Sequence, residues 1–291
     1  MNKEELKALV AQMLSELGGT QTPKAPPKGT VQEEHSFPPL EDISQIDLRQ
    51  QYLVEQPYKS RDFLRLKEKT PARLGAGKAG PRYKTATLLR FRADHAAARD
   101  SVFRTIGEDF AKSHGLIPLK TRCRDKDEYL TRPDLGRCFD EVNEKVISST
   151  WKGTRVMLVI GDGLSSAAIE ANALDCTAAI RQGLQNEGIS LDKIPFVQFC
   201  RVGASDHIGD LTGCELLCLL VGERPGLGTA ESMSAYITYR PHRGIPEAKR
   251  TVISNIHRQG IHAVEAGAHI ASLMTEMLRQ KASGIDLRQE G

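Results

Sequence analysis

The residues whose types and spacing could carry chemistry follow three apolar runs of the chain. The clearest case is "LLCLLVGERPGLGTAES" at 216–232, where four leucines and a valine precede a cluster of glycines. The apolar run predicts a buried strand ending at Gly222. Gly222, Gly226 and Gly228 carry no side chain, so we expect a large flat ligand to approach the backbone here.

The side-chain chemistry of this segment is limited to Glu223 and Arg224. Glu223 can accept hydrogen bonds, free backbone amides can donate them, and Pro225 stiffens the loop. A phosphate loop would need a lysine and consecutive amide donors at the start of a helix. The pattern therefore favours a bulky neutral ligand with many amides.

A second run ends in "VIGDGLSS" at 159–166, which is close to a dinucleotide fingerprint but has Ser166 in place of the third glycine. The next predicted strand ends in Cys200 and Arg201 rather than in an acid that could hold a ribose. A nicotinamide-dependent oxidoreductase is an alternative that rests on this turn alone. A tight strand-to-helix turn capped by Ser165 or Ser166 explains it more simply.

The third segment is "CRVGASDHIGD" at 200–210, in which Asp206, His207 and Asp210 follow a strand end. A capped, solvated helix start explains these three better than a metal or acid–base site. Elsewhere there is no GxSxG elbow, and His257 and His262 are five residues apart across a glycine. The sequence thus predicts a binding surface with no catalytic residue and no metal site of its own.

Strands interleaved with helices must position these turns. The spacing predicts helices over 133–148, 168–188 and 263–284, the last ended by Gly284. Strands are predicted in "LIPLKTRC", "RVMLVIGDG", "PFVQFCRV", "CELLCLLVG" and "MSAYITYRP". This order is typical of an α/β fold: a Rossmann-like, largely parallel sheet flanked by helices, with ligands beyond the carboxyl ends of the strands.

Three parts are predicted along the chain: a tail at 1–40, a small α-helical domain at 41–112 and the α/β domain at 113–291. In the small domain, one or two helices are expected within 51–70. Another is expected at 85–103, with Leu88, Leu89, Phe91, His95 and Val102 as its apolar side. Between them is a basic glycine-rich loop with Arg73, Lys78, Arg82 and Lys84, which we expect to contact a partner protein, although a solvated loop would show the same pattern.

The tail begins with "EELKALVAQMLSELGG", whose leucines, valine and methionine lie on one helical face, and continues into a flexible proline-rich linker. A short tethered helix of this kind is typical of an interaction segment, and docking back on its own domain is the alternative.

Composition excludes several classes of protein. The formal net charge is only +3, with 26% charged and 40% hydrophobic residues, so neither nucleic-acid nor membrane binding is expected. No apolar stretch is long enough to cross a bilayer. The 6 cysteines form no CxxC pair, which favours buried free thiols in a reducing cytoplasm over a zinc site.

Several motifs together resemble one family. "AGPRYKTATLLRFRADHAAARD", "YLTRPDLGR", "DGLSSAAI", "LLVGERPGLGTAESMSAY" and "RTVISNIHRQG", taken in order, are similar to the small (light) subunit of ethanolamine ammonia-lyase. The resemblance runs from about Pro71 to Ile285, and "LLVGERPGLG" followed by "ISNIH" is its most specific part. The first 40 residues carry no motif of the family.

The resemblance implies an adenosylcobalamin-dependent enzyme that converts ethanolamine to acetaldehyde and ammonia. In this family the large subunit holds the substrate, and the small subunit covers the cobalamin. The family's cobalamin contacts correspond here to Val202, Glu223 and Val252, together with the surrounding loop. Some relatives have cysteine at the position of Val252, so only apolar or backbone contact is implied there. The segment around Val202 matches the family less closely than the rest.

The resemblance also implies a cytoplasmic location inside a bacterial microcompartment. Helices on linkers serve there as encapsulation peptides, so we expect residues 1–20 to bind the shell or other cargo. A protein that acts only in shell assembly remains a further alternative.

Overall fold

The computed structural model describes residues 43, 52–70 and 72–287, all of which belong to one compact unit, Asp42–Gly291. The helix predicted near the N-terminus and its linker lie outside the described residues. The chain is mixed α/β, with a 6-stranded sheet in the order β3-β5-β4-β6-β7-β8. These strands are β3 (Ile117–Lys120), β4 (Val156–Gly161), β5 (Pro195–Gln198), β6 (Leu216–Gly222), β7 (Met233–Tyr239) and β8 (Arg250–Ile256).

The sheet is parallel over β3, β5, β4 and β6, as predicted, but β7 and β8 pair antiparallel. The five predicted strands are all present, whereas β8 was not predicted. β8 escaped prediction because its burial does not alternate simply: Ser254 and Asn255 are both exposed, and the pairing with β7 contains a register shift.

Eight helices are assigned within the described residues: α2 (Ser60–Lys67), α3 (Thr85–Phe103), α4 (Glu108–Ser113), α5 (Lys126–Thr131), α6 (Glu141–Trp151), α7 (Ser166–Asn186), α8 (Ala204–Thr212) and α9 (Ala263–Gln280). A short hairpin, β1 (Lys78–Ala79) and β2 (Arg82–Tyr83), occupies the basic glycine-rich loop. Short 3₁₀ turns lie at Leu135–Arg137, Glu247–Lys249 and Gly284–Asp286.

One helix, Ser60–Lys67, lies within 51–70 among the residues described there, in agreement with the one or two helices predicted. Two other helix predictions need correction at their ends. The helix predicted from 133 begins at Glu141, where the Asp140 carboxylate accepts a hydrogen bond from the Asn143 amide. The last helix ends at Gln280 rather than at Gly284, because Lys281 adopts the left-handed conformation at φ 55°.

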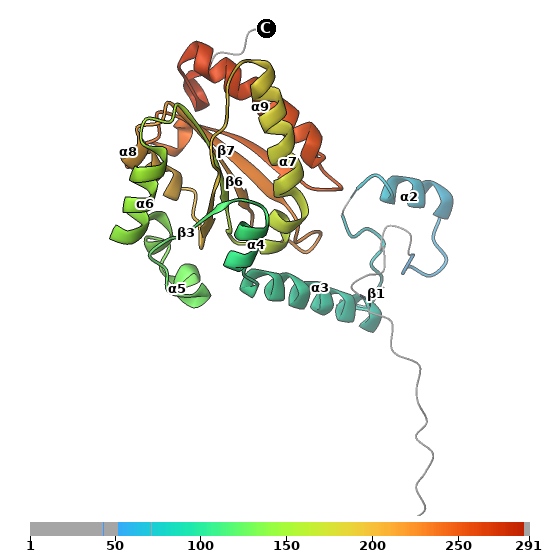
Figure 1. Ribbon diagram of the computed structural model, residues 1–291. Coiled ribbons are helices and arrows are strands. Elements are labelled where there is room, and N and C mark those ends of the chain that lie inside the picture. Colours follow the sequence, from blue (N-terminus) through green and yellow to red (C-terminus); the bar gives the residue numbers. More distant parts are fainter. Residues whose placement is uncertain (1–42, 44–51, 71, 288–291) are drawn as a thin grey trace, which may run out of the picture. The chain divides into compact units, whose positions relative to one another are not determined.

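The sheet separates two hydrophobic layers. Helices α7 and α9 lie on one side of the sheet and α6 and α8 on the other (Figure 1). We call these sides the α7–α9 face and the α6–α8 face. All 7 residues of β6 are buried, so its leucines alternate between the two layers. Each fully buried leucine contributes about 1.5–3 kcal/mol relative to an exposed one.

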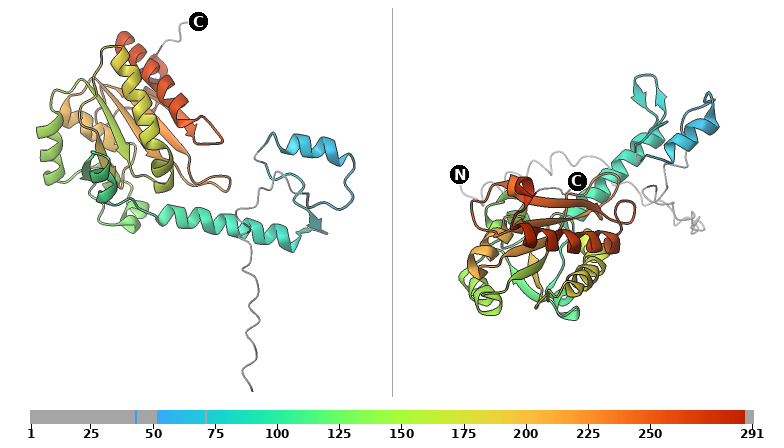
Figure 2. Two further views of the ribbon diagram at one scale, coloured as in Figure 1. Left: turned by 45° about the vertical axis from the view of Figure 1, so that its right-hand side comes forward. Right: turned by 90° about the horizontal axis from the view of Figure 1, so that it is seen from above.

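Helix α3 leads from α4 to the β1–β2 hairpin, with α2 near its far end (Figure 2). Its bounds are those predicted, but its predicted apolar side is partly wrong. Leu88 and Leu89 are 41% and 49% exposed, whereas Thr87 and Asp94 are buried. Asp94 is buried because it forms ion pairs with Arg73 (2.6 Å) and Arg90 (2.8 Å), so charge pairing decides which side of α3 faces inward.

Candidate functional site

The end of β6 places Glu223 on the α6–α8 face. Side chains alternate along a strand, and Val221, two residues earlier, belongs to the hydrophobic cluster of that face. The Glu223 amide donates to the Ser232 carbonyl at 2.9 Å, which extends the β6–β7 pairing by one step. The Tyr236 hydroxyl donates to Glu223 Oε1 at 2.7 Å. Backbone and side chain of Glu223 are therefore both held by the sheet.

Val202 and Val252 lie on the same face as Glu223. Across the strands, Tyr236 is registered with Leu219 on one side and Val252 on the other. Leu219 belongs to the α6–α8 cluster, and Tyr236 and Val202 pack against it. Val252 is 44% exposed, so an apolar surface is open at this point. The fold thus gathers three of the predicted residues on one face.

Gly222 does not open a surface to a ligand, contrary to prediction. A Cβ at this position would lie 1.9 Å from the Ser165 carbonyl oxygen. The residue is buried, and glycine is required because the turn after β4 crosses the end of β6 here. The role of Gly222 is close packing inside the protein.

Arg224, Gly226 and Gly228 lie in the exposed part of the loop and line a groove of about 1090 Å³. The opposite walls come from residues 68–70, 72 and 73 and from the end of β8 with the turn after it. A Cβ at Gly228 would meet nothing within 4 Å, so this backbone is open as predicted. Val202, Glu223 and Val252 do not line the groove, so the predicted residues occupy two different surfaces.

Hydrogen bonds anchor the loop between β6 and β7 at several points. The Gly226 amide donates to the Thr229 carbonyl at 3.0 Å and closes a tight turn. Asn172 Nδ2 donates to the Glu231 carbonyl at 2.9 Å, and the Ser165 hydroxyl donates to the Ala230 carbonyl. The loop is therefore ordered by α7 and by the turn before it.

The "GDGLSS" turn is a packing motif. A Cβ at Gly161 would lie 2.8 Å from Cys200, and one at Gly163 would lie 2.7 Å from the Gly222 carbonyl. Asp162 is fully buried and accepts hydrogen bonds from the Ile106 amide (3.1 Å) and the Ser166 hydroxyl (2.6 Å). Ser165 caps α7, as predicted. These glycines join strand ends and leave no open space for a dinucleotide.

Asp206 and His207 begin α8, but they are buried rather than solvated as predicted. Both Asp206 oxygens bind the Arg250 guanidinium, at 2.7 and 2.9 Å, and Arg250 lies at the start of β8. Burial alone would lower the pKa of Arg250, but the bonds to Asp206 and Glu247 raise it. This ion pair ties α8 to β8.

His207 joins α8 to its neighbours in the α6–α8 layer. Its Nδ1 accepts a hydrogen bond from the Phe139 amide at 3.2 Å, and Nε2 lies 3.3 Å from Glu144 on α6. Burial, with the nearby Arg243 charge, lowers the pKa of the imidazole. The residue serves as a neutral structural bridge between two helices.

The basic glycine-rich loop makes several contacts within the chain. Arg73 Nη2 donates to the Leu227 carbonyl at 2.9 Å, in addition to its ion pair with Asp94. Lys84 pairs with Glu55 at 2.5 Å, and Lys78 lies over the Tyr83 ring. Arg73 and Lys84 thus hold parts of this chain together. The expected contact of the loop with a partner protein stays a prediction.

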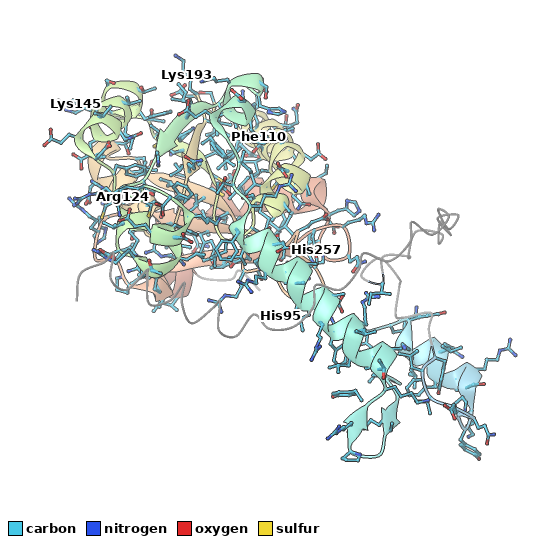
Figure 3. All side chains as sticks on the ribbon, turned by 90° about the horizontal axis from the view of Figure 1, so that it is seen from below. His95, Phe110, Arg124, Lys145, Lys193 and His257 are labelled. Atoms are coloured by element: carbon cyan, nitrogen blue, oxygen red, sulfur yellow. The ribbon has the colours of Figure 1, made fainter. Side chains whose placement is uncertain are left out.

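Among the described residues, no group of three or more His, Cys, Asp or Glu could hold a metal ion. His95 and His257, labelled in Figure 3, come from different elements, α3 and the turn after β8. None of the described helices is long and apolar enough to cross a membrane. All six cysteines are free, and all except Cys138 are buried, close to the prediction.

Two residues with important contacts escaped the sequence analysis: Tyr236, which contacts Glu223, and Arg250, which pairs with Asp206. Tyr236 carried only the signal that it lies within a predicted strand. Arg250 carried none, because its partner Asp206 is 44 residues away and the strand that positions it was not predicted.

Comparisons with known proteins agree on one family. A family model described as "Ethanolamine ammonia-lyase light chain (EutC)" matches residues 60–288. The chain is 55% identical over 293 residues to the ethanolamine ammonia-lyase small subunit of Clostridioides difficile (strain 630), covering 99% of this chain and 100% of that protein. The ethanolamine ammonia-lyase small subunit of Listeria monocytogenes serotype 4a (strain HCC23) is 53% identical to this chain, with the same coverage of both chains. This chain belongs to the ethanolamine ammonia-lyase small-subunit family.

Proposed function

We propose that this subunit holds adenosylcobalamin against a large subunit, in an enzyme that converts ethanolamine to acetaldehyde and ammonia by a radical mechanism. The observation that carries the proposal is the surface formed by Val202, Glu223 and Val252 on the α6–α8 face. On this surface the fixed Glu223 carboxylate lies beside the apolar side chains of Val202 and Val252. Glu223 belongs to the part of the chain that is similar to the family's most specific motif.

The chemistry of these residues fits a corrinoid. Within the described part of the chain, Glu223 Oε1 accepts from Tyr236 while Oε2 has no hydrogen-bond partner. A carboxylate oxygen accepts hydrogen bonds only, and the side-chain amides of cobalamin are donors. The exposed Val252 side chain, 44% accessible, offers apolar contact to the flat edge of a macrocycle. The Glu223 carboxylate therefore offers an acceptor to the amide donors of the corrinoid.

Adenosylcobalamin, when bound, supplies homolysis of its cobalt–carbon bond, which initiates radical chemistry. The contribution of this chain is to bind and orient. Glu223 would hold a cofactor amide, while Val202 and Val252 would exclude water from one side. The partner named by "small subunit" would hold the ethanolamine.

The proposal is tested with Glu223→Ala in the complex co-expressed with the large subunit. Loss of a hydrogen bond to a charged acceptor predicts roughly tenfold weaker binding of hydroxocobalamin, followed by its absorbance. Glu231→Ala, an exposed acid in the same loop, is the matched control and should bind normally. Gel filtration should show intact subunit association in both. Normal cobalamin affinity in Glu223→Ala would contradict the proposal.

The N-terminal segment is assigned a separate role, inside a cytoplasmic microcompartment. Residues 1–20 are proposed to act as an encapsulation peptide that binds shell or cargo proteins, because their apolar positions recur at helical spacing. A fluorescent protein fused to residues 1–20 should concentrate in shells in shell-forming cells. Diffuse fluorescence there, with a full-length fusion still concentrated, would contradict this role.

A further inference from the structure

Tyr236 is the contact that determines where the Glu223 carboxylate lies. Its ring is in the middle of β7 and is flanked by β6 and β8 on either side in hydrogen-bonded register. Side chains on the central positions of a sheet are held more rigidly than side chains on loops. Glu223, by contrast, is the first residue after β6 and begins a glycine-rich loop. The strand residue can therefore position the loop residue.

The direction of the hydrogen bond is settled by chemistry. Burial, and then the contact with Glu223, raise the pKa of the Tyr236 phenol above its usual range. The hydroxyl stays protonated at physiological pH and can only donate to the carboxylate, at 2.7 Å. One oxygen of Glu223 is occupied in this way. The other keeps its lone pairs for a ligand.

We infer that Tyr236 is a positioning residue of the cobalamin site, acting through Glu223. This inference rests on the proposed function and deepens it. A glutamate side chain has three rotatable bonds, and ordering it opposes binding unless it is ordered beforehand. The Tyr236 hydroxyl removes that freedom before the ligand arrives. Because the Tyr236 ring also lies beside Val252, it links the polar and the apolar parts of the surface.

The same strand contains a matched control. Tyr239, three residues later in β7, donates its hydroxyl to Glu215 Oε1 at 3.2 Å. Glu215 precedes β6, whereas Glu223 follows it, so this second tyrosine–glutamate pair lies at the opposite end of the strand. Glu215 also forms an ion pair with Arg155 at 2.7 Å. Tyr239→Phe therefore removes an equivalent hydroxyl away from the proposed site.

The experiment uses the two-subunit complex and four variants: Tyr236→Phe, Tyr239→Phe, Glu223→Gln and the double variant Tyr236→Phe/Glu223→Gln. The dissociation constant of hydroxocobalamin is measured by absorbance titration, and assembly by gel filtration. We expect Tyr236→Phe to weaken binding about three- to tenfold and Tyr239→Phe to leave it unchanged. The double variant should bind no more weakly than Glu223→Gln, because Tyr236 acts through Glu223.

The outcomes separate this inference from the proposed function. Unchanged binding in both Glu223→Ala and Glu223→Gln would remove Glu223 from the site and overturn both. Weakened binding in Glu223→Gln with unchanged binding in Tyr236→Phe would overturn the role of Tyr236 alone. Full additivity in the double variant would mean that Tyr236 acts on the ligand independently. Loss of assembly in Tyr236→Phe but not in Tyr239→Phe would show that the role of Tyr236 is purely structural. Both full additivity and this loss of assembly would overturn the inference.

Discussion

The two faces of the sheet differ most at strands β7 and β8. On the α7–α9 face, Met233, Ala235 and Ile237 of β7 and Ile256 of β8 are all part of one continuous core. On the α6–α8 face, the cluster contains residues of β3 to β6, while Tyr236 only packs against it and Val252 stays 44% exposed. The same two strands thus pack on the core on one side and are partly open on the other.

The difference shows how one sheet can serve stability and binding separately. On the covered face, helix–sheet packing holds the strands in register. On the partly open face, the strand residues are free to present a carboxylate anchor and an apolar patch. Changes on the first face should therefore alter folding, whereas changes at the open part of the second should alter binding of the proposed cofactor.

The largest effect is expected where the covered and open parts of the α6–α8 face meet. Asp206→Ala removes the main partner of Arg250, whose side chain is only 2% exposed. A buried charge left without its partner lowers the free energy of unfolding by about 3–5 kcal/mol. Because Arg250 keeps its bond to Glu247, we expect a loss of about 3 kcal/mol. Urea unfolding of the full chain, followed by circular dichroism, measures this loss.

Asp210→Ala is the control, because Asp210 lies one helical turn later on α8 and pairs with a largely exposed partner, Arg243. An exposed ion pair contributes at most about 1 kcal/mol, so this variant should remain close to wild type. Equal losses in the two variants would contradict the structural role assigned to the Asp206–Arg250 pair.

A smaller loss is expected on the α7–α9 face from Gly267→Ala. A Cβ at Gly267 in α9 would lie 2.6 Å from the Cys176 carbonyl of α7, so the two helices must separate. Overpacking of this kind costs about 1–3 kcal/mol. Unfolding should occur at lower urea, while the assembled complex should bind hydroxocobalamin normally. If Gly267→Ala weakened hydroxocobalamin binding without a loss of stability, the assignment of stability to one face and binding to the other would be wrong.

Much of this architecture follows from sequence patterns. The five predicted strands and α3 and α7 are correct because apolar runs and helical spacing are local properties. Strand β8 was missed because its pairing with β7 contains a register shift. The end of α9 was misplaced because Lys281, and not the glycine at 284, adopts the left-handed backbone that ends the helix.

The candidate site was only partly predictable, for a similar reason. A glycine pattern cannot tell a residue that opens the surface, such as Gly228, from one that lets backbones cross, such as Gly222. The family resemblance indicated Glu223, but Tyr236 became a candidate only when the β7 register placed its hydroxyl against that carboxylate.

His207 provides a pH-dependent comparison within the covered part of the α6–α8 face. Burial, together with the Arg243 charge, lowers its pKa below 6.5 in the folded protein. Below about pH 6.5 the unfolded chain binds a proton that the folded chain does not, so stability is lost as the pH falls toward the lowered pKa. In His207→Gln, urea midpoints measured from pH 7.5 to 5 should decline less than in wild type, because the variant takes up roughly one proton fewer on unfolding. Identical slopes would contradict the buried neutral state of His207.

The smallest effect is expected for neighbouring residues that face opposite sides of β8. Val252→Ala removes two methyl groups from the open surface, so hydroxocobalamin binding to the complex should weaken roughly threefold with stability within about 0.5 kcal/mol of wild type. Ile253→Ala truncates a side chain that packs on the α7–α9 core, so it should lower stability by about 1–2 kcal/mol and leave binding unchanged. If Val252→Ala lost stability and Ile253→Ala lost affinity, the open part of the α6–α8 face would be structural and the cofactor surface would have to lie elsewhere. Affinity lost only in Val252→Ala and stability lost only in Ile253→Ala would assign the two functions to opposite faces of a single strand, because adjacent strand residues point to opposite sides of the sheet.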